Sequence, residues 1–418
     1  PLPIPTPPVP PSNYTRSGTT ESGVNSVKFL INGTSTTISV VNRAFSYAYD
    51  DALTSFKTDT SDANTKKITT LDLSASCLLS TCTAVSFDGL EACTEIEGMG
   101  YLELPAATNI DYIFRNCKKL TSIYLNGRME NLTSAKAICD GCTNLVEFWC
   151  NGVFANITNA DYWFRNCTKQ ITNWGMNNAT FASVTSAVGM FYNCNRVYGL
   201  PAATFAAVDD MSKFYYGIGV SGMYRLKFSD NIANFAGQPL NVSEMFSNVK
   251  YQVIMTDGLD LTAIEDCNQM FSNCTLTTEI SLNSTFDSAT GVDASGMFRQ
   301  CSKLATLSDR TFEGVDNASY MFTNAFVDNA NVKLTSATFE NATNVSSMFV
   351  NCKMKKLYAI LIALLALAWT EASAQQRRPI DSQHPMWFIH VDVWYKADPQ
   401  KIIDLIPDKI KPYVCYYV

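Results

Sequence analysis

Cysteine and histidine are the residues of this sequence whose side chains most readily do chemistry. The chain has 14 cysteines and two histidines, His384 and His390. Residues 1–350 contain no histidine, so a Ser-His-Asp triad, a Cys-His pair and a histidine-ligated metal are excluded there. Cys139 and Cys142 form a Cys-x-x-Cys pair, a spacing that can be redox-active or bind zinc. No second ligand pair accompanies it, so we expect no metal and no cofactor.

The cysteines are also candidates for disulfides, because an exported chain is oxidised outside the cell. Cys77 with Cys82 and Cys139 with Cys142 are the best candidate pairs. Eight cysteines instead share one position of a repeated pattern: Cys93, Cys117, Cys142, Cys167, Cys194, Cys274, Cys301 and Cys352. Equivalent side chains of a repeat point the same way, and Val249 and Ala325 replace cysteine in two copies. We therefore interpret this set as small buried hydrophobic residues.

Carboxylate pairs and aromatic residues offer two other kinds of site. The pairs Asp50-Asp51, Asp209-Asp210 and Glu91 with Glu95 could act in acid-base catalysis, but no histidine accompanies them and solvated turn positions explain them better. Four aromatic residues lie near predicted strands: Tyr101, Tyr124, Trp149 and Trp174. If they face outward, they supply stacking platforms for a glycan or anchors for a protein partner. If they face inward, they fill the core, and the sequence favours neither alternative.

The charge of the chain argues against nucleic acid as a partner. The net charge is −7, and no long run of Lys or Arg precedes residue 353. A nucleic-acid-binding surface needs a basic patch, so we expect none. Hydrophobic residues make up 47% of the chain, which is enough for a substantial core.

A pattern that recurs about every 25 residues must position these side chains. Its copies are IFRNC (113–117), AICDGC (137–142), WFRNC (163–167), MFYNC (190–194), KFYYG (213–217), MFSNV (245–249), MFSNC (270–274), MFRQC (297–301), MFTNA (321–325) and MFVNC (348–352), with a weaker copy ending at Cys93. One such unit is too short to bury its own apolar face, so stacked units must bury it against each other. The pattern therefore predicts a solenoid.

Each copy is followed by apolar residues with the spacing of a short strand. Ile123 and Leu125 follow Cys117, and Phe148 and Cys150 follow Cys142 at the same distance. A spacing of two places both side chains on one side of a strand. The recurring phenylalanines should form a ladder along the interior: Phe114, Phe164, Phe191, Phe246, Phe271, Phe298, Phe322 and Phe349. We expect an irregular coil between residues 217 and 245, where one interval is long.

The M-F-x-x-C and L-x-x-L-x-L patterns resemble the BspA-like leucine-rich repeats over residues 77–352. This resemblance implies short parallel strands joined by turns or short helices, and an exported, surface-attached binding protein. It implies no catalytic residues and names no partner.

The residues before the repeat divide into two predicted segments. Residues 1–23 are rich in Pro and then in Ser and Thr, which is typical of a linker. Residues 24–76 contain two predicted strands that meet at Asn32-Gly33, a strong hairpin signal. We expect this small β unit to cap the first coil.

The residues after Cys352 do not follow the sequence pattern of the repeat. Residues 354–374 have the basic start, apolar run and small-residue end of a signal peptide, here as a hydrophobic helix. Residues 375–418 predict a truncated β-α-β fragment that resembles the start of an exported (β/α) barrel of the glycoside hydrolase family 98 type. The fragment is too short to be active. We interpret Met354 as the start of a different reading frame.

The sequence thus predicts a protein at the cell surface or outside the cell, which binds a protein or glycan partner through a solenoid face and is not an enzyme. One alternative is a structural or receptor-binding component of an appendage or phage fibre. The other is a glycoside hydrolase, whose catalytic part would be the C-terminal fragment.

Overall fold

The computed structural model describes most of the chain before residue 353. The described residues are 14–49, 53–73, 81–99, 104–125, 129–150, 154, 156–169, 173–175, 181–195, 205–232, 235–282, 286, 290–307, 312–327, 339 and 341–352. The predicted signal-like helix and β-α-β fragment lie outside them. No helix within the described ranges is long and apolar enough to cross a membrane.

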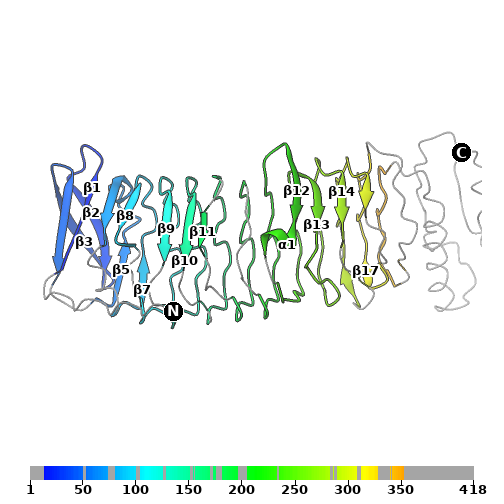
Figure 1. Cartoon of the computed structure of the whole chain (residues 1–418), viewed down its shortest axis with the longest axis horizontal. Coiled ribbons are helices and arrows are strands. Elements are labelled where there is room, and N and C mark those ends of the chain that lie inside the picture. The colour runs from blue at the N-terminus through cyan, green and yellow to red at the C-terminus, as the bar shows by residue number, and fades with distance from the viewer. Residues whose placement is uncertain are drawn as a thin grey trace, which may run out of the picture.

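The described chain is a β-solenoid with very little helix, in which coils follow one another along a single axis (Figure 1). Its strands are β1 Tyr14–Thr20, β2 Ser26–Ile31, β3 Thr34–Val41, β4 Ala44–Tyr49, β5 Ser55–Thr58, β6 Ile68–Asp72, β7 Ala84–Ser86, β8 Glu95–Glu97, β9 Ser122–Leu125, β10 Glu147–Cys150, β11 Asn173–Gly175, β12 Met223–Lys227, β13 Tyr251–Met255, β14 Glu279–Ser281, β15 Val292–Asp293, β16 Thr306–Leu307 and β17 Val315–Asn317. The helical elements are η1 Thr65–Lys67 and α1 Phe228–Asn231.

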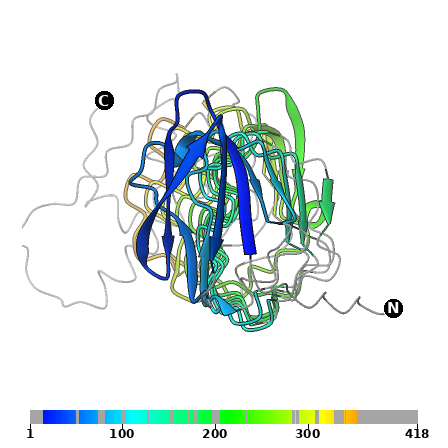
Figure 2. The same ribbon diagram turned by 90° about the vertical axis from the view of Figure 1, so that its left-hand side faces the viewer.

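An antiparallel sheet covers the N-terminal end of the coils, as Figure 2 shows along the axis. Its strand order is β7-β5-β2-β3-β4-β1-β6-β8. Only the pairs β5–β7 and β6–β8 are parallel, and each leads into one side of the solenoid. The sheet therefore changes from antiparallel to parallel pairing at both edges, and this lets it join the coils.

Two predictions for this end have different outcomes. The hairpin is confirmed, because β2 pairs with β3 around Asn32 and Gly33, which have φ of 49° and 80°. The linker prediction is wrong for Tyr14–Thr20. These residues form β1, between β4 and β6, and Thr20 is fully buried.

The coils have a strand face and a turn face. On the strand face, β9, β10 and β11 form one parallel sheet, and β12, β13, β14 and β16 form another. The predicted inward pairs are confirmed, since Ile123, Leu125, Phe148 and Cys150 are all fully buried.

On the turn face, each coil touches the next through one β-bridge residue. The bridges run through Ala84, Asn109, Ser134, Asn159, Ser186, Asp210, Asn241, Asp266 and Asp293, and a further bridge joins Asn317 to Asn344. Beyond each bridge, alternate backbone amides donate to the following coil. Tyr112 N bonds Lys136 O at 2.8 Å, and Phe114 N bonds Ile138 O at 2.9 Å. The turn face thus has one repeating hydrogen-bond pattern.

The predicted phenylalanine ladder lies inside the solenoid. Phe246, Phe271 and Phe298 stack with centroids 5.4 and 5.5 Å apart and planes within 4° of parallel. Tyr215 occupies the same position between Phe191 and Phe246. A second aromatic row, not predicted, includes stacks of Phe181 on Phe205 and of Phe286, Phe312 and Phe339.

The recurring cysteines are free thiols that also donate hydrogen bonds, and all but the half-buried Cys352 are buried. Cys142 Sγ lies 3.0 Å from Phe114 O, and Cys274 Sγ lies 3.0 Å from Phe246 O, each in the preceding coil. Cys139 and Cys142 are both free, so the disulfide predicted between them is absent. Cys142 Sγ bonds the preceding coil, as most of its set does, whereas Cys93 Sγ bonds Glu95 O of its own coil. Cys82 is also a buried free thiol, and Cys77 lies outside the described residues.

Candidate functional site

From Asn116 onward, the residue immediately before the recurring cysteine, or before the residue that replaces the cysteine, has a left-handed backbone. Seven of these residues are asparagines with φ between 56° and 62°: Asn116, Asn166, Asn193, Asn248, Asn273, Asn324 and Asn351. Gly141 and Gly217 occupy the same position, with φ of 76° and 67°. Asparagine and glycine tolerate this conformation better than other residues. The backbone of the turn face therefore selects these residue types.

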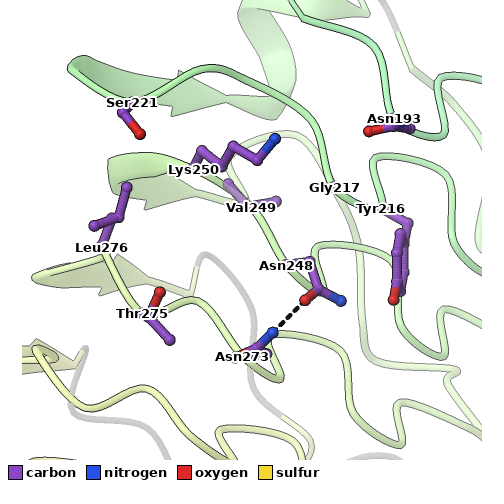
Figure 3. Close-up of a pocket in the computed structure, with 10 residues that line it drawn as sticks. All are labelled: Asn193, Tyr216, Gly217, Ser221, Asn248, Val249, Lys250, Asn273, Thr275 and Leu276. Carbon is purple, nitrogen blue, oxygen red and sulfur yellow. Dashed lines mark hydrogen bonds between the residues drawn. The ribbon is translucent and has the colours of Figure 1, made fainter. Parts of the chain in front are cut away.

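Where asparagines occupy this position in neighbouring coils, their side-chain amides bond to each other. Asn193 Nδ2 donates to Asn166 Oδ1 at 3.1 Å, and Asn351 Nδ2 donates to Asn324 Oδ1 at 2.9 Å. Asn273 Nδ2 also donates to Asn248 Oδ1 (Figure 3). We call this row of amides the asparagine ladder.

Gly217 interrupts the asparagine ladder. A Cβ at this glycine would lie 3.7 Å from Asn193 Oδ1, so a side chain here would continue the row. In its absence, no described residue donates a hydrogen bond to Asn193 Oδ1, and Asn248 Nδ2 bonds Ser247 Oγ of its own coil at 3.1 Å. The missing side chain leaves an amide acceptor on one side of a gap and an amide donor on the other.

A surface hollow of about 470 Å³ occupies this gap (Figure 3). It is lined by Asn193, Tyr216, Gly217, Ser221, Asn248, Val249, Lys250, Asn273, Thr275 and Leu276. The lining thus combines amides, hydroxyls, one cation and one aromatic ring. A volume between about 300 and 1,000 Å³ with a few converging polar groups is typical of a small-ligand site.

The ring of Tyr216 forms one wall of the hollow. One face of the ring stacks on Tyr192. The next coil has Ser247 at the equivalent position, and a serine is too short to cover the other face. Burial, Tyr192 and Glu244 raise the pKa of Tyr216, so its hydroxyl stays protonated at neutral pH. The ring is therefore a neutral stacking surface.

Lys250 supplies the charge of the hollow. Its side chain extends across the space toward the Asn193 side (Figure 3), and no carboxylate of the described residues forms an ion pair with it. Lys250 is thus a cation available to a ligand.

The irregular coil predicted between residues 217 and 245 is present and borders the hollow. Its arm, residues 217–232, includes β12 and extends beyond the neighbouring coils (Figure 1). Gly219 lets the arm pass close to β13, because a Cβ there would lie 2.7 Å from the Tyr251 ring. Val220 and Tyr224 on this arm are 41% and 69% exposed.

The four predicted aromatic residues do not form one platform. Tyr124 and Trp149 are in register on β9 and β10, with Tyr124 exposed and Trp149 half-buried. Tyr124 Oη donates to Glu147 Oε2 at 2.8 Å. Trp174 is in register with the buried Phe148 rather than with Trp149. Tyr101 lies outside the described residues.

The predicted carboxylate pairs have structural surroundings where they are described. Glu91 forms ion pairs with Lys118 and Lys66, and the hydrogen bond from Lys118 is the main reason that its pKa is lowered. Asp210 Oδ1 accepts from the backbone amide of Ser212 at 2.8 Å. Asp50 and Asp51 lie outside the described residues. Within the described ranges, no three His, Cys, Asp or Glu side chains are grouped as metal ligands.

In comparison with known proteins, one part of the chain matches a family model. Residues 240–359 match the family model described as "Mycoplasma protein of unknown function, DUF285". No curated protein matches the chain, and no solved structure does. The matched segment contains Asn248, Lys250 and Asn273, while Asn193 and Tyr216 precede it, so the hollow lies at its N-terminal limit.

The hollow was not predicted from the sequence, which contains only part of the signal for it. The residue before the recurring cysteine is Asn or Gly in eight of the ten copies as the sequence aligns them, which indicates positive φ. The copy KFYYG (213–217) instead aligns Gly217 with the cysteine. The structure shifts this copy by one residue, because Tyr215 rather than Phe214 stacks between Phe191 and Phe246, and this places Gly217 between the asparagines. The open face of Tyr216 has no comparable signal, because it depends on the length of Ser247 in another coil.

Proposed function

We propose that this protein is an exported, cell-surface binding protein that recognises a glycan at the hollow beside Gly217. The solenoid would present the site, and the N-terminal sheet and continuous interior would hold it rigid. The ring of Tyr216, which is half-buried and lines the hollow, carries the proposal. A flat aromatic face beside amide and hydroxyl groups suits a sugar ring, whose C–H face stacks while its hydroxyls exchange hydrogen bonds.

We also propose that the coils are of the BspA-like leucine-rich-repeat type. The parallel strand face and the recurring Phe and Cys support this, as does the resemblance of the repeat. The resemblance further supports export and a role in adhesion. This fold would supply the scaffold and no catalytic group.

A protein partner is the second candidate, and the arm favours it. Val220 and Tyr224 expose apolar surface at its end, and Arg225 and Asp230 pair beside them at 3.0 Å. Exposed aromatic residues with charged neighbours are typical of protein interfaces. This contact would lie next to the hollow and could act with it.

A binding screen with the full chain tests the proposal. The protein is applied to an array of host and microbial glycans and, in parallel, to extracellular matrix proteins. Glycan binding that Tyr216→Ala removes would support the proposal. Binding to a matrix protein that Tyr224→Ala removes, and Tyr216→Ala does not, would favour the second candidate. Absence of binding to any glycan would count against the first.

A further inference from the structure

We propose that the hollow selects acidic saccharides, with the carboxylate of the sugar against Lys250 and its ring on Tyr216. This inference rests on the proposed function, because it names the class of glycan that the same site would take. Sialic acids and uronic acids share the required chemistry, which is a pyranose ring carrying a carboxylate.

The charge of the lining leads to this class. Lys250 is the only charged residue among the ten that line the hollow, and it is exposed. The chain as a whole has a net charge of −7, so an unpaired cation in a concave site is a local exception to the general charge. A carboxylate entering here would gain a charge-assisted hydrogen bond, which is stronger than a neutral one.

The amides beside Lys250 suit the hydroxyls of a sugar. Asn193 Oδ1 can accept a hydrogen bond, and Asn248 Nδ2 keeps a second hydrogen beyond its bond to Ser247. Asn273 Oδ1 is a further acceptor, because only its Nδ2 serves the asparagine ladder. Asn248 and Asn273 lie on consecutive coils of the turn face, and Asn193 lies two coils before Asn248, across the gap at Gly217. A ligand with hydroxyls on adjacent carbons could therefore bond Asn248 and Asn273 together, while another part of the ligand bonds Asn193.

An acidic peptide would match the cation but not the rest of the lining. A peptide carboxylate at the end of a flexible side chain needs no flat platform, whereas Tyr216 presents one within the same hollow. Ser221 and Thr275 add hydroxyls at its rim. Ring, amides and cation together favour a saccharide.

The test compares glycans that differ only at the carboxyl group. Oligosaccharides ending in sialic acid, oligosaccharides of uronic acid, and their carboxyl-reduced counterparts are titrated into the full chain by calorimetry. We expect the acidic forms to bind at least about fivefold more tightly than the reduced forms. The two acidic series show which sugar is preferred. An Asp- and Glu-rich peptide is included, and we expect it not to bind.

Variants of Lys250 test whether this residue causes the preference for acidic glycans. Lys250→Gln should bring the affinity for acidic forms down to that for reduced forms, and Lys250→Arg should retain most of the preference. Lys119→Gln removes one exposed charge on a distant coil and should have no effect. Raising the salt concentration from about 0.05 to 0.5 M should weaken acidic-glycan binding by the wild type but not by Lys250→Gln.

Two other results would overturn the inference in distinguishable ways. Equal binding of acidic and reduced glycans, lost in Tyr216→Ala, would reject the acidic preference and leave the proposed glycan site intact. Binding of the acidic peptide alone, or of no saccharide, would reject the inference and the glycan site together.

Discussion

The ring of Tyr216 lies 4.5 Å from the ring of Tyr192, centroid to centroid, with the two planes 2° from parallel. Tyr192 thus supports one face of Tyr216 and leaves the other to the hollow. Tyr216→Ala should weaken glycan binding by about tenfold or more, whereas Tyr216→Phe keeps the ring and should retain most of the affinity. Titration of the same glycan into each variant checks this.

The matched control for that experiment is Tyr320→Ala. Tyr320 is 48% exposed on the turn face and does not line the hollow. Its removal should leave the affinity unchanged. Equal losses for the two alanine variants would show that Tyr216 has no specific role.

Restoring the asparagine ladder should close the hollow. Gly217→Asn places an amide where φ is 67°, a value close to those of the asparagines at the same position. The new side chain could bond Asn193 Oδ1, so we expect an unchanged or higher melting temperature together with loss of glycan binding. Gly141→Asn is the corresponding change on a distant coil, but the new side chain would clash there, because Asn116 Oδ1 lies 2.7 Å from the added Cβ. Gly296→Asn is therefore the better control, and it should leave glycan binding unchanged.

The buried hydroxyl of Tyr215 should be a cost to stability. It stands in the phenylalanine ladder, it is fully buried, and its oxygen has no hydrogen-bond partner. An unsatisfied buried polar group costs about 1–3 kcal/mol, so Tyr215→Phe should raise the free energy of unfolding by about 1 kcal/mol. Urea denaturation measures the change. Phe214→Tyr adds a hydroxyl at the adjacent buried position and should have the opposite effect.

Asp161 should stabilise a coil to which it does not belong. Its Oδ1 accepts from Val188 N at 2.9 Å and from Ser186 Oγ, both in the following coil. Asp161→Ala should lower the free energy of unfolding by about 1–3 kcal/mol, because it leaves a backbone amide unsatisfied. Denaturant titration tests this, and Asp209→Ala, which removes an exposed carboxylate, should change stability by less than about 0.5 kcal/mol.

A second substitution should restore part of that loss. In other coils the bridge residue itself accepts from the amide two residues later, as Asn241 does from Ser243 N at 2.9 Å. Ser186→Asn should supply this acceptor within its own coil. The loss caused by Asp161→Ala should therefore be smaller in the Ser186→Asn background, and simple additivity of the two changes would contradict the explanation.

Alkaline pH should destabilise the solenoid through its thiols. Burial raises the pKa of Cys93 and of Cys194 to about 12, from an ordinary value of 9.0. Below pH 9 the thiols are protonated in both states and contribute fully to stability. Between pH 9 and 12 only the unfolded state loses these protons, so the free energy of unfolding should fall as pH rises. Denaturation under reducing conditions from pH 8 to 11 measures the slope.

The same burial predicts slow thiol labelling. At pH 8, iodoacetamide should modify Cys93 and Cys194 only after unfolding, because the thiolate is the reactive form. Peptide mass mapping with and without urea compares them. Rapid labelling of either residue in the native protein would contradict the buried position.

The repeat was predictable from the sequence because each copy carries the same apolar residues at the same positions and must bury them. Phe246, Phe271 and Phe298 recur at one position, and only stacked coils can bury them together. The position of Ile123 and Leu125 on a strand follows for the same reason. In contrast, β1 was missed, because Tyr14–Thr20 is short, polar and without apolar alternation. Its pairing depends on β4 and β6, which are distant in sequence.

The candidate site was less predictable, because it arises from differences between copies. Tyr216 is a platform only because Ser247 is small, and Lys250 is available because no carboxylate of the described residues pairs with it. Tyr124 and Trp149 drew attention by their residue type, but Tyr124 already bonds Glu147. Such relationships between neighbouring coils require the register that the structure supplies.

The turn face has a further consequence for how this kind of protein can change. From Asn109 onward, two left-handed residues follow each bridge residue at fixed distances, as Tyr112 and Asn116 do after Asn109. The turn face therefore has one length in these coils, and differences in coil length fall on the opposite side. New loops can be added there, as with the arm, without altering the stacking of adjacent units. Ligand preference can thus change from one variant to another, while the turn face, which stabilises the stack of coils, stays unchanged.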